Sequence, residues 1–293
     1  MTIVNKVVFC EGDQTSLDYQ LLNQVLQLPE NIAIVPSGGK FAFYDFARGY
    51  FFPDPVQNQS YIIFRDRDFD APPSPDVRLI PGANQRIWMT HRACIQNYLL
   101  EPELIHAYWQ AKYKEKQENP TAKWGHGDSP GIEAISQWIE SSATSIQSYQ
   151  AVRWALGDLL QMTGARSQLK TTWTGGSGKL PSSLEIDDCK MSAIQEIIEP
   201  FRRQVDAITV SGFEESLDKY LAEFAAPDFW HNKGYMIWFH GKDILKEMHR
   251  QNNRYISIDD FFEEWFKQEE WVNQLDITRY PDFIELQSKL EQL

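Results

Sequence analysis

Short apolar runs and helical periodicity alternate along the first part of the chain. β-branched, apolar runs predict buried strands at 3–10, 31–37 and 60–66. The stretches VRLIPG and RIWMT predict two shorter strands. Amphipathic segments separate the runs, so residues 1–115 are expected to form an α/β domain with a largely parallel sheet.

Beyond residue 115 the sequence shows mainly helical periodicity. Residues 116–133 are polar and rich in Gly and Pro, which is typical of a linker or loop. Residues 134–293 predict a mainly helical region that packs on the first domain. Pro200 predicts a break in one helix. Residues 235–250 predict a single helix whose apolar positions face the core: Ile237, Trp238, Ile244, Leu245 and Met248.

The net charge of −13 argues against a protein that simply coats nucleic acid, because such proteins are basic. If the chain meets nucleic acid, a metal ion, a basic patch or a partner must offset the repulsion. Cys10, Cys94 and Cys189 form no CxxC pair, so we expect reduced thiols and neither a zinc site nor a disulfide framework. No signal peptide or membrane segment is expected, which favours a cytoplasmic location.

Acidic residues follow two of the predicted strands. VVFCEGD carries Glu11 and Asp13, and IIFRDRDFD carries Asp66, Asp68 and Asp70. The carboxyl ends of parallel strands lie at one edge of a sheet, so Glu11, Asp66 and Asp68 are expected to converge. Converging carboxylates repel unless a divalent cation holds them, which predicts a site for Mg²⁺ or Mn²⁺ suited to phosphoryl transfer. A solvated loop or a helix cap is the alternative for any one acid taken alone.

Other residues are candidates for supporting roles. Asp13 and Asp70 are candidates for a second metal or its outer shell. PSGGKF follows a strand and opens a helix, so Lys40 is a candidate phosphate ligand, with an ordinary turn as the equal alternative. TGGSGKL, residues 174–180, does not fit the Walker pattern and is expected to be a flexible loop.

Four stretches together resemble the TOPRIM domains of OLD-like nucleases. A strand ending in Glu-Gly, followed later by a strand ending in Asp-x-Asp, is the TOPRIM signature. RACIQNYLL, residues 92–100, is similar to an R-x-x-x-E-N-Y-L-L helix of one subgroup, and WFHGKDIL, residues 238–245, to its late Gly-Lys segment. That subgroup includes the AriB-type effectors of the PARIS anti-phage defence system.

The resemblance implies a Rossmann-like fold and a metal-dependent nuclease. Glu11 matches the catalytic or metal-binding glutamate, and Asp66 and Asp68 match the metal-binding pair. Lys242 matches the Gly-Lys position that faces the scissile phosphate, although such a lysine is otherwise usually a surface charge. Gln96 stands where the subgroup has glutamate; an amide is a poorer Mg²⁺ ligand, which favours one metal or a partner-completed site.

The resemblance also implies partners. AriB-type effectors are held by an ABC-type ATPase, AriA, and act as dimeric nucleases on tRNA. The expected function is therefore phosphodiester hydrolysis, on tRNA, in anti-phage defence. Two alternatives stay open: an OLD-type DNA nuclease with the same site, and a non-catalytic TOPRIM-shaped regulatory or binding module, which Gln96 favours.

Overall fold

The chain is described here from a computed structural model, which divides it into two compact units. The first comprises Met1–Ile146 and Asp228–Leu293, and the second comprises Gln147–Pro227. The structure describes residues 6–26, 28–39, 43–55, 59–82, 84–162, 183, 186–206, 208–252, 255–267 and 276–293. Lys40 and the TGGSGKL stretch lie outside these residues.

The first unit is built on a five-stranded sheet with the strand order β2-β1-β3-β5-β4. Strands β1, β2, β3 and β5 run parallel, and β4 pairs antiparallel with β5 at the edge. The predicted α/β class with a largely parallel sheet is thereby confirmed. The strands are β1 Lys6–Cys10, β2 Ile32–Pro36, β3 Ser60–Arg65, β4 Ile80–Pro81 and β5 Ile87–Met89.

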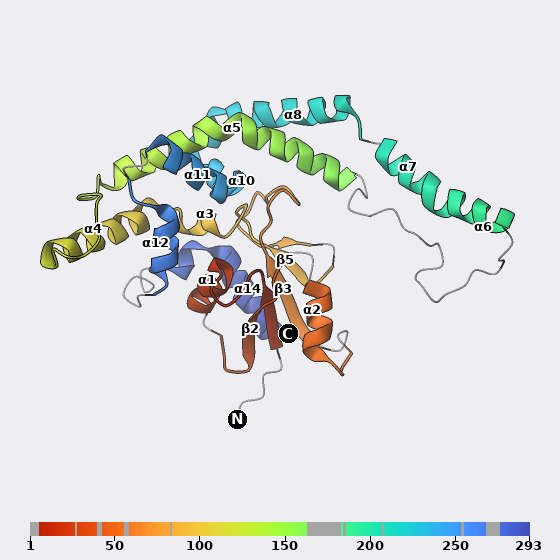
Figure 1. Cartoon of the computed structure of the whole chain (residues 1–293), viewed down its shortest axis with the longest axis horizontal. Coiled ribbons are helices and arrows are strands. Elements are labelled where there is room, and N and C mark those ends of the chain that lie inside the picture. Colours follow the sequence, from red (N-terminus) through yellow and green to blue (C-terminus); the bar gives the residue numbers. More distant parts are fainter. Residues whose placement is uncertain are drawn as a thin grey trace. The chain divides into compact units, whose positions relative to one another are not determined.

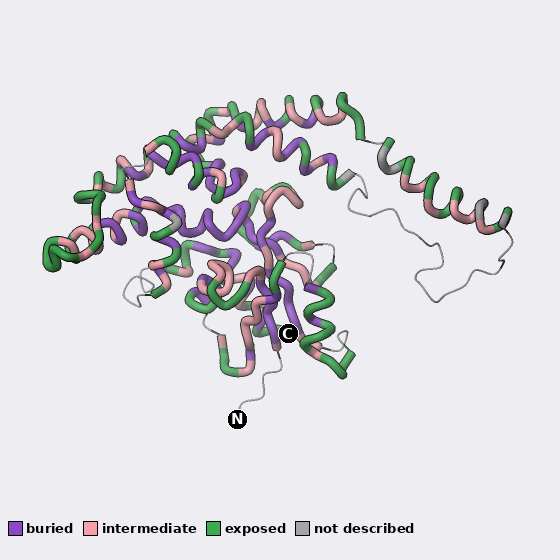
Figure 2. Tube along the Cα trace, in the orientation of Figure 1, coloured by how far each residue is buried: buried purple, intermediate pink, exposed green. Residues whose placement is uncertain are grey.

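Helices cover both faces of this sheet (Figure 1). Successive strand side chains point to opposite faces. On one face Phe9 contacts aromatic residues of α2, and on the other Phe64 lies 5.8 Å from Phe283 of α14, measured between ring centroids. Most of β1 and β3 is consequently buried (Figure 2). The helices beside the sheet are α1 Leu17–Val25, α2 Phe43–Phe51 and α14 Pro281–Gln292.

Further helices complete the first unit. Residues 119–131 form a non-helical connection where the linker 116–133 was expected. The units nevertheless divide elsewhere, within α5, because Asp228–Leu293 packs with Met1–Ile146. The further helices of the first unit are α3 Gln96–Leu99, α4 Pro102–Glu118, the start of α5 Ile132–Met162, α9 Pro227–His231, α10 Tyr235–Trp238, α11 Gly241–Gln251, α12 Ile258–Trp265 and the 3₁₀ turn Ile277–Arg279.

The second unit is helical in its described part. Its elements, apart from the end of α5, are α6 Ile186–Ser192, a π-helical segment Ala193–Ile198, α7 Glu199–Asp206 and α8 Val210–Ala225. The break expected at Pro200 is absent, because Pro200 lies in the first turn of α7. There the π-helical segment already replaces the α-helical pattern, with the Glu199 N–H donating to the Ile194 carbonyl.

The prediction of one helix over residues 235–250 is wrong. The helix is interrupted between α10 and α11, where Phe239 is extended. The Asn97 side-chain amide donates to the carbonyls of Met236 (3.1 Å) and Phe239 (3.0 Å), and this holds the interruption open. Within the described residues, the structure contains no helix both long and apolar enough to cross a membrane.

Candidate functional site

A tight turn places Glu11 directly after β1. Gly12 adopts φ +80°, and its backbone N–H and carbonyl exchange hydrogen bonds with Gly38 at 2.8 and 2.9 Å. A Cβ at Gly12 would lie 2.3 Å from the Cβ of Ser16, the residue that caps α1. Glycine is therefore required here, and the Glu-Gly pair lets α1 begin immediately behind the strand end.

Asp66 and Asp68 follow β3, which pairs with β1 in parallel. Phe9 is level with Ile63, so the residues after both strands emerge at the same edge of the sheet. Asp66 is buried, and its Oδ1 accepts the Ile95 N–H at 2.8 Å. Asp68 has φ +51°, and its Oδ1 lies 3.1 Å from Nε2 of His240. The predicted proximity of these strand ends is thus present.

Asp18, in the first turn of α1, belongs to the same cluster. Burial raises the pKa of Asp18 to about 6; Lys242 lowers this pKa and Asp68 raises it. The Oδ1 atom of Asp18 is buried and has no hydrogen-bond partner among the described residues. Asp18 was not among the predicted site residues, although an acid in the helix that follows Glu-Gly was a usable signal.

The electrostatic environment of Asp66 defines the cluster. Burial raises the pKa of Asp66 well above its ordinary value, and the charges of Asp18, Asp68 and Glu11 raise it further. Lys242 acts in the opposite direction. We call Glu11, Asp18, Asp66, Asp68 and Lys242 the acidic cluster. Carboxylates crowded in this way need a proton or a cation to balance them.

Lys242 reaches this cluster from the first turn of α11. Burial lowers the pKa of Lys242, but Asp66 and other neighbouring groups raise it, and the net shift is upward. The residue as a whole is exposed, while its charged group interacts with the acids of the cluster. The structure therefore brings together the predicted acids and the predicted lysine, which lie far apart in the sequence.

Close packing at Gly241 positions that lysine. The Gly241 N–H donates to Oδ1 of Asn97 at 2.9 Å, and a Cβ at Gly241 would lie 2.7 Å from the same oxygen. The first turn of α11 thus packs directly against α3. Gly241 has no side chain, which allows the backbone of α3 to approach here.

The supporting candidates occupy different places. Gln96 begins α3, next to Ile95, and its Oε1 is buried with no hydrogen-bond partner among the described residues. Asp13 accepts hydrogen bonds from the backbone and hydroxyl of Thr15, at 2.8 and 2.6 Å, in the turn before α1. Asp70 forms a 2.6 Å ion pair with Arg65. Asp13 and Asp70 therefore have structural partners of their own.

Arg67 lies between the two aspartates and was not anticipated. Its side chain is buried, and its guanidinium donates to the carbonyls of His91 (3.2 Å), Ala71 (2.7 Å) and Ile237 (2.7 Å). Burial lowers the pKa of Arg67 to about 10, so it stays charged at neutral pH. Arg67 ties the Asp66–Asp68 segment to the backbone just before α11.

The oxygen donors of the cluster match the chemistry of Mg²⁺, which prefers carboxylate ligands and keeps several waters. The carboxylates are not, however, spaced as metal ligands are. No three His, Cys, Asp or Glu side chains of the described residues are grouped as they would be around a metal ion. Binding of a cation would therefore require these carboxylates to turn toward a common point.

Comparisons with known proteins do not extend this description. No protein-family model matches the chain, and no curated protein is significantly similar to it. The fold and the acidic cluster are therefore the basis on which a function can be argued.

Proposed function

We propose that this chain is a TOPRIM nuclease that hydrolyses phosphodiester bonds with Mg²⁺ or Mn²⁺, with tRNA as its substrate. The supporting observation is the acidic cluster: Glu11 and the Asp66–Asp68 pair follow adjacent parallel strands, and the buried carboxylate of Asp66 interacts with the charges of Glu11, Asp18, Asp68 and Lys242. The order and spacing of these residues also resemble the TOPRIM pattern of OLD-like nucleases.

Each residue then has a distinct role. A divalent cation held by Glu11, Asp66 and Asp68 would polarise the scissile phosphate. The Lys242 ammonium group opposes the negative charge that develops on the transferred phosphoryl group. Asn97 and Gly241 are positioning residues, because they set where Lys242 enters the cluster. Asp18 adds negative charge and strengthens the attraction for a cation.

The proposal includes a regulatory partner. An AriA-like ABC-type ATPase would hold the chain inactive, and release would yield a homodimeric nuclease. The net charge of −13 suits docking on a basic partner surface. The same charge makes a counter-ion or a partner necessary for any approach to nucleic acid.

A cleavage assay tests the function directly. The purified chain, alone and with its presumed ATPase, is incubated with tRNA and with plasmid DNA, with and without Mg²⁺. We expect Mg²⁺-dependent cuts in tRNA, lost in Lys242→Ala and kept in Lys246→Ala, an exposed lysine on the same helix. Cleavage of plasmid alone would favour the OLD-type DNA nuclease. Intact substrates under every condition would contradict nuclease activity.

Two observations favour a non-catalytic TOPRIM-shaped binding module as the second candidate. Lys242 already supplies positive charge to Asp66, Asp18 and Asp68, and an amide replaces the expected glutamate at position 96. The variant Gln96→Glu separates the two candidates. A nuclease limited by a missing ligand should gain activity or bind Mg²⁺ more tightly, whereas a binding module should stay inactive.

A further inference from the structure

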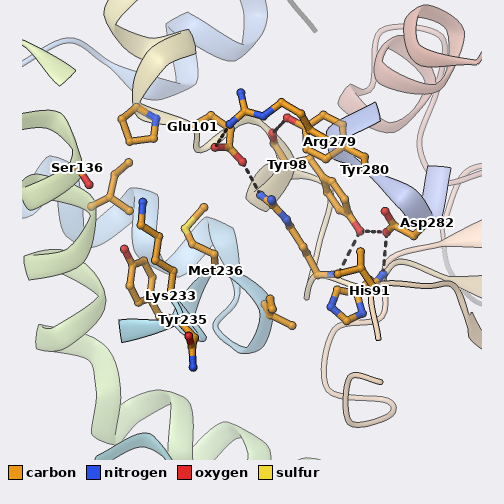
Figure 3. A pocket seen from close by; sticks show the side chains of 16 residues that line it. His91, Tyr98, Glu101, Ser136, Lys233, Tyr235, Met236, Arg279, Tyr280 and Asp282 are labelled. Carbon is orange, nitrogen blue, oxygen red and sulfur yellow. Dashed lines mark hydrogen bonds and ion pairs between the residues drawn. The ribbon is translucent and has the colours of Figure 1, made fainter. Parts of the chain in front are cut away.

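A pocket of about 200 Å³ lies in the first unit, separate from the acidic cluster. The segment that leads into α3 and α4, the start of α5, the α9–α10 connection and the turn before α14 surround it (Figure 3). Of the acidic cluster, no member is among the described residues that line this pocket. We call it the α3–α10 pocket.

Three cationic side chains line the α3–α10 pocket: Arg92, Lys233 and Arg279. Glu101 contacts the two arginines, at 3.0 Å from Arg92 and 3.5 Å from Arg279. Lys233 is exposed and forms no ion pair with any residue that the structure describes. Glu101 and Asp282 also line the pocket, so the three cations exceed the acids by one charge, and Lys233 supplies that charge for an anionic ligand.

Two buried groups on the pocket wall have unused hydrogen-bonding atoms. His91 and Asp282 are 3% and 1% exposed. Oδ2 of Asp282 accepts from the Tyr98 hydroxyl and the His91 backbone N–H, but Nδ1 of His91 and Oδ1 of Asp282 have no partner among the described residues. Both atoms are themselves buried and are not open to the pocket.

Apolar groups form another part of the wall. Pro102, Ile139, Met236 and the ring of Tyr235 face the same space. Binding pockets usually combine such a wall with a few polar groups that fix the orientation of the ligand. The volume is below the roughly 300–1,000 Å³ typical of drug-sized ligands, which limits the occupant to a small molecule.

We propose that the α3–α10 pocket binds a small organic anion, with its phosphate or carboxylate group against Arg92, Lys233 and Arg279 and its apolar body against Ile139 and Met236. Binding here does not depend on nuclease activity.

The pocket shares residues with the framework of the acidic cluster. His91 and Ile237 line the pocket, and their carbonyls accept from Arg67, which lies between Asp66 and Asp68. Arg92 donates to the Asn97 carbonyl at 2.6 Å, and Asn97 anchors the start of α11. An occupant of the pocket therefore contacts the residues that hold the cluster in place.

Isothermal titration without divalent cations tests the proposal with phenyl phosphate, benzoate, inorganic phosphate and benzyl alcohol. Phenyl phosphate and benzoate distinguish the two anionic groups, inorganic phosphate lacks the apolar body, and benzyl alcohol lacks the charge. We expect one or both aromatic anions to bind at least about tenfold more tightly than benzyl alcohol and inorganic phosphate, since one lost ionic or apolar contact costs about 1.4 kcal/mol or more.

Variants locate the binding. Arg279→Ala and Lys233→Gln alter exposed side chains and should each weaken the aromatic anion at least about tenfold without changing the melting temperature of the free protein. Lys246→Ala and Lys242→Ala should leave the affinity unchanged. Three results would overturn the proposal: no binding of any probe at millimolar concentration, equal binding of benzyl alcohol, or an affinity that falls in Lys242→Ala and not in the pocket variants.

Discussion

Asp66 is the residue on which the candidate site depends. It is 5% exposed, yet it keeps a carboxyl group surrounded by three other acids. One backbone N–H and the Lys242 charge are its favourable contacts. A protein without a use for this arrangement would gain stability from an apolar residue here, because burial of like charges is costly. This local cost is the strongest sign of function at the scale of single residues.

Replacement of Glu11 by alanine tests the cluster most directly. If Glu11 holds the metal or orients water, Glu11→Ala should lower the cleavage rate by about 10²–10⁴ while the protein stays folded. Glu118→Ala, an exposed acid at the end of α4, is the matched control and should keep full activity. Single-turnover cleavage and far-UV circular dichroism provide the two readouts; an active Glu11→Ala protein would refute the assignment.

His91 should make the stability depend on pH. Burial, with Arg67 and Arg92 nearby, lowers the pKa of His91 from 6.5 to about 4, so the folded state holds the neutral imidazole. The neutral imidazole suits the folded state, so its contribution to the unfolding free energy is complete above pH 6.5. That contribution is lost as the pH falls toward 4, because the unfolded chain binds a proton at His91 first. Between pH 7 and pH 5 the loss should be about 2 kcal/mol.

Urea unfolding at several pH values measures this effect. His91→Asn keeps a polar side chain without a titrating ring, so its unfolding free energy should change less over the same interval. Asp282, which faces His91, titrates in both proteins and cancels in the comparison. Parallel pH profiles for the two proteins would show that His91 does not titrate as described.

At the scale of elements, the interruption between α10 and α11 decides whether Lys242 can reach the acids. The Asn97 side chain donates to the carbonyls at the end of α10 and accepts the N–H of Gly241, the first residue of α11. One side chain therefore caps the end of one helix and the start of the next. Gly241 is the residue that permits this contact. Without the interruption, a continuous helix could not present the Gly-Lys pair at its own N-terminus.

Gly241→Ala should therefore destabilise the protein. The new Cβ would lie 2.7 Å from Oδ1 of Asn97 and 3.0 Å from its backbone nitrogen, and the overpacking should cost about 1–3 kcal/mol. Gly49→Ala is the control, because Gly49 lies within α2 with no atom near its added Cβ. That change should stabilise by about 0.5–1 kcal/mol. Equal effects of the two substitutions on chemical unfolding would rule out the close contact.

At the scale of the whole molecule, charge is the dominant property. The chain carries 41 acidic and 28 basic side chains, and the acidic cluster adds local repulsion to that excess. A bound cation would relieve repulsion in the folded state only, and any ligand selective for the folded state raises its stability. Cation binding should therefore be measurable as a gain in stability, without an activity assay.

Mg²⁺ or Mn²⁺ should raise the melting temperature. At a cation concentration 100 times the dissociation constant, the gain is about 2.7 kcal/mol. The double variant Asp66→Asn, Asp68→Asn removes two candidate ligands and should abolish the rise. Thermal unfolding with and without cation, at constant ionic strength, makes the comparison. An identical rise in the double variant would place the cation elsewhere.

Local patterns in the sequence were sufficient for the sheet and for the acids that end its strands. The apolar runs around Val7 and Ile62 predict strands, and the residues that follow such strands must emerge at an edge. That Glu11 and Asp66 emerge at one edge then requires only that the two strands pair in parallel, as β1 and β3 do. These features depend on periods of a few residues, which a single sequence displays directly.

The tertiary structure alone decided the rest of the site. Asp18 resembles any acid in a first helical turn until the packing buries it, and Arg67 resembles a surface charge until three carbonyls surround its guanidinium. The meeting of Lys242 with Asp66 was suggested by resemblance and not by pattern. Contacts between segments far apart in the chain depend on how side chains such as Asn97 interrupt and dock the helices, and no local period encodes that packing.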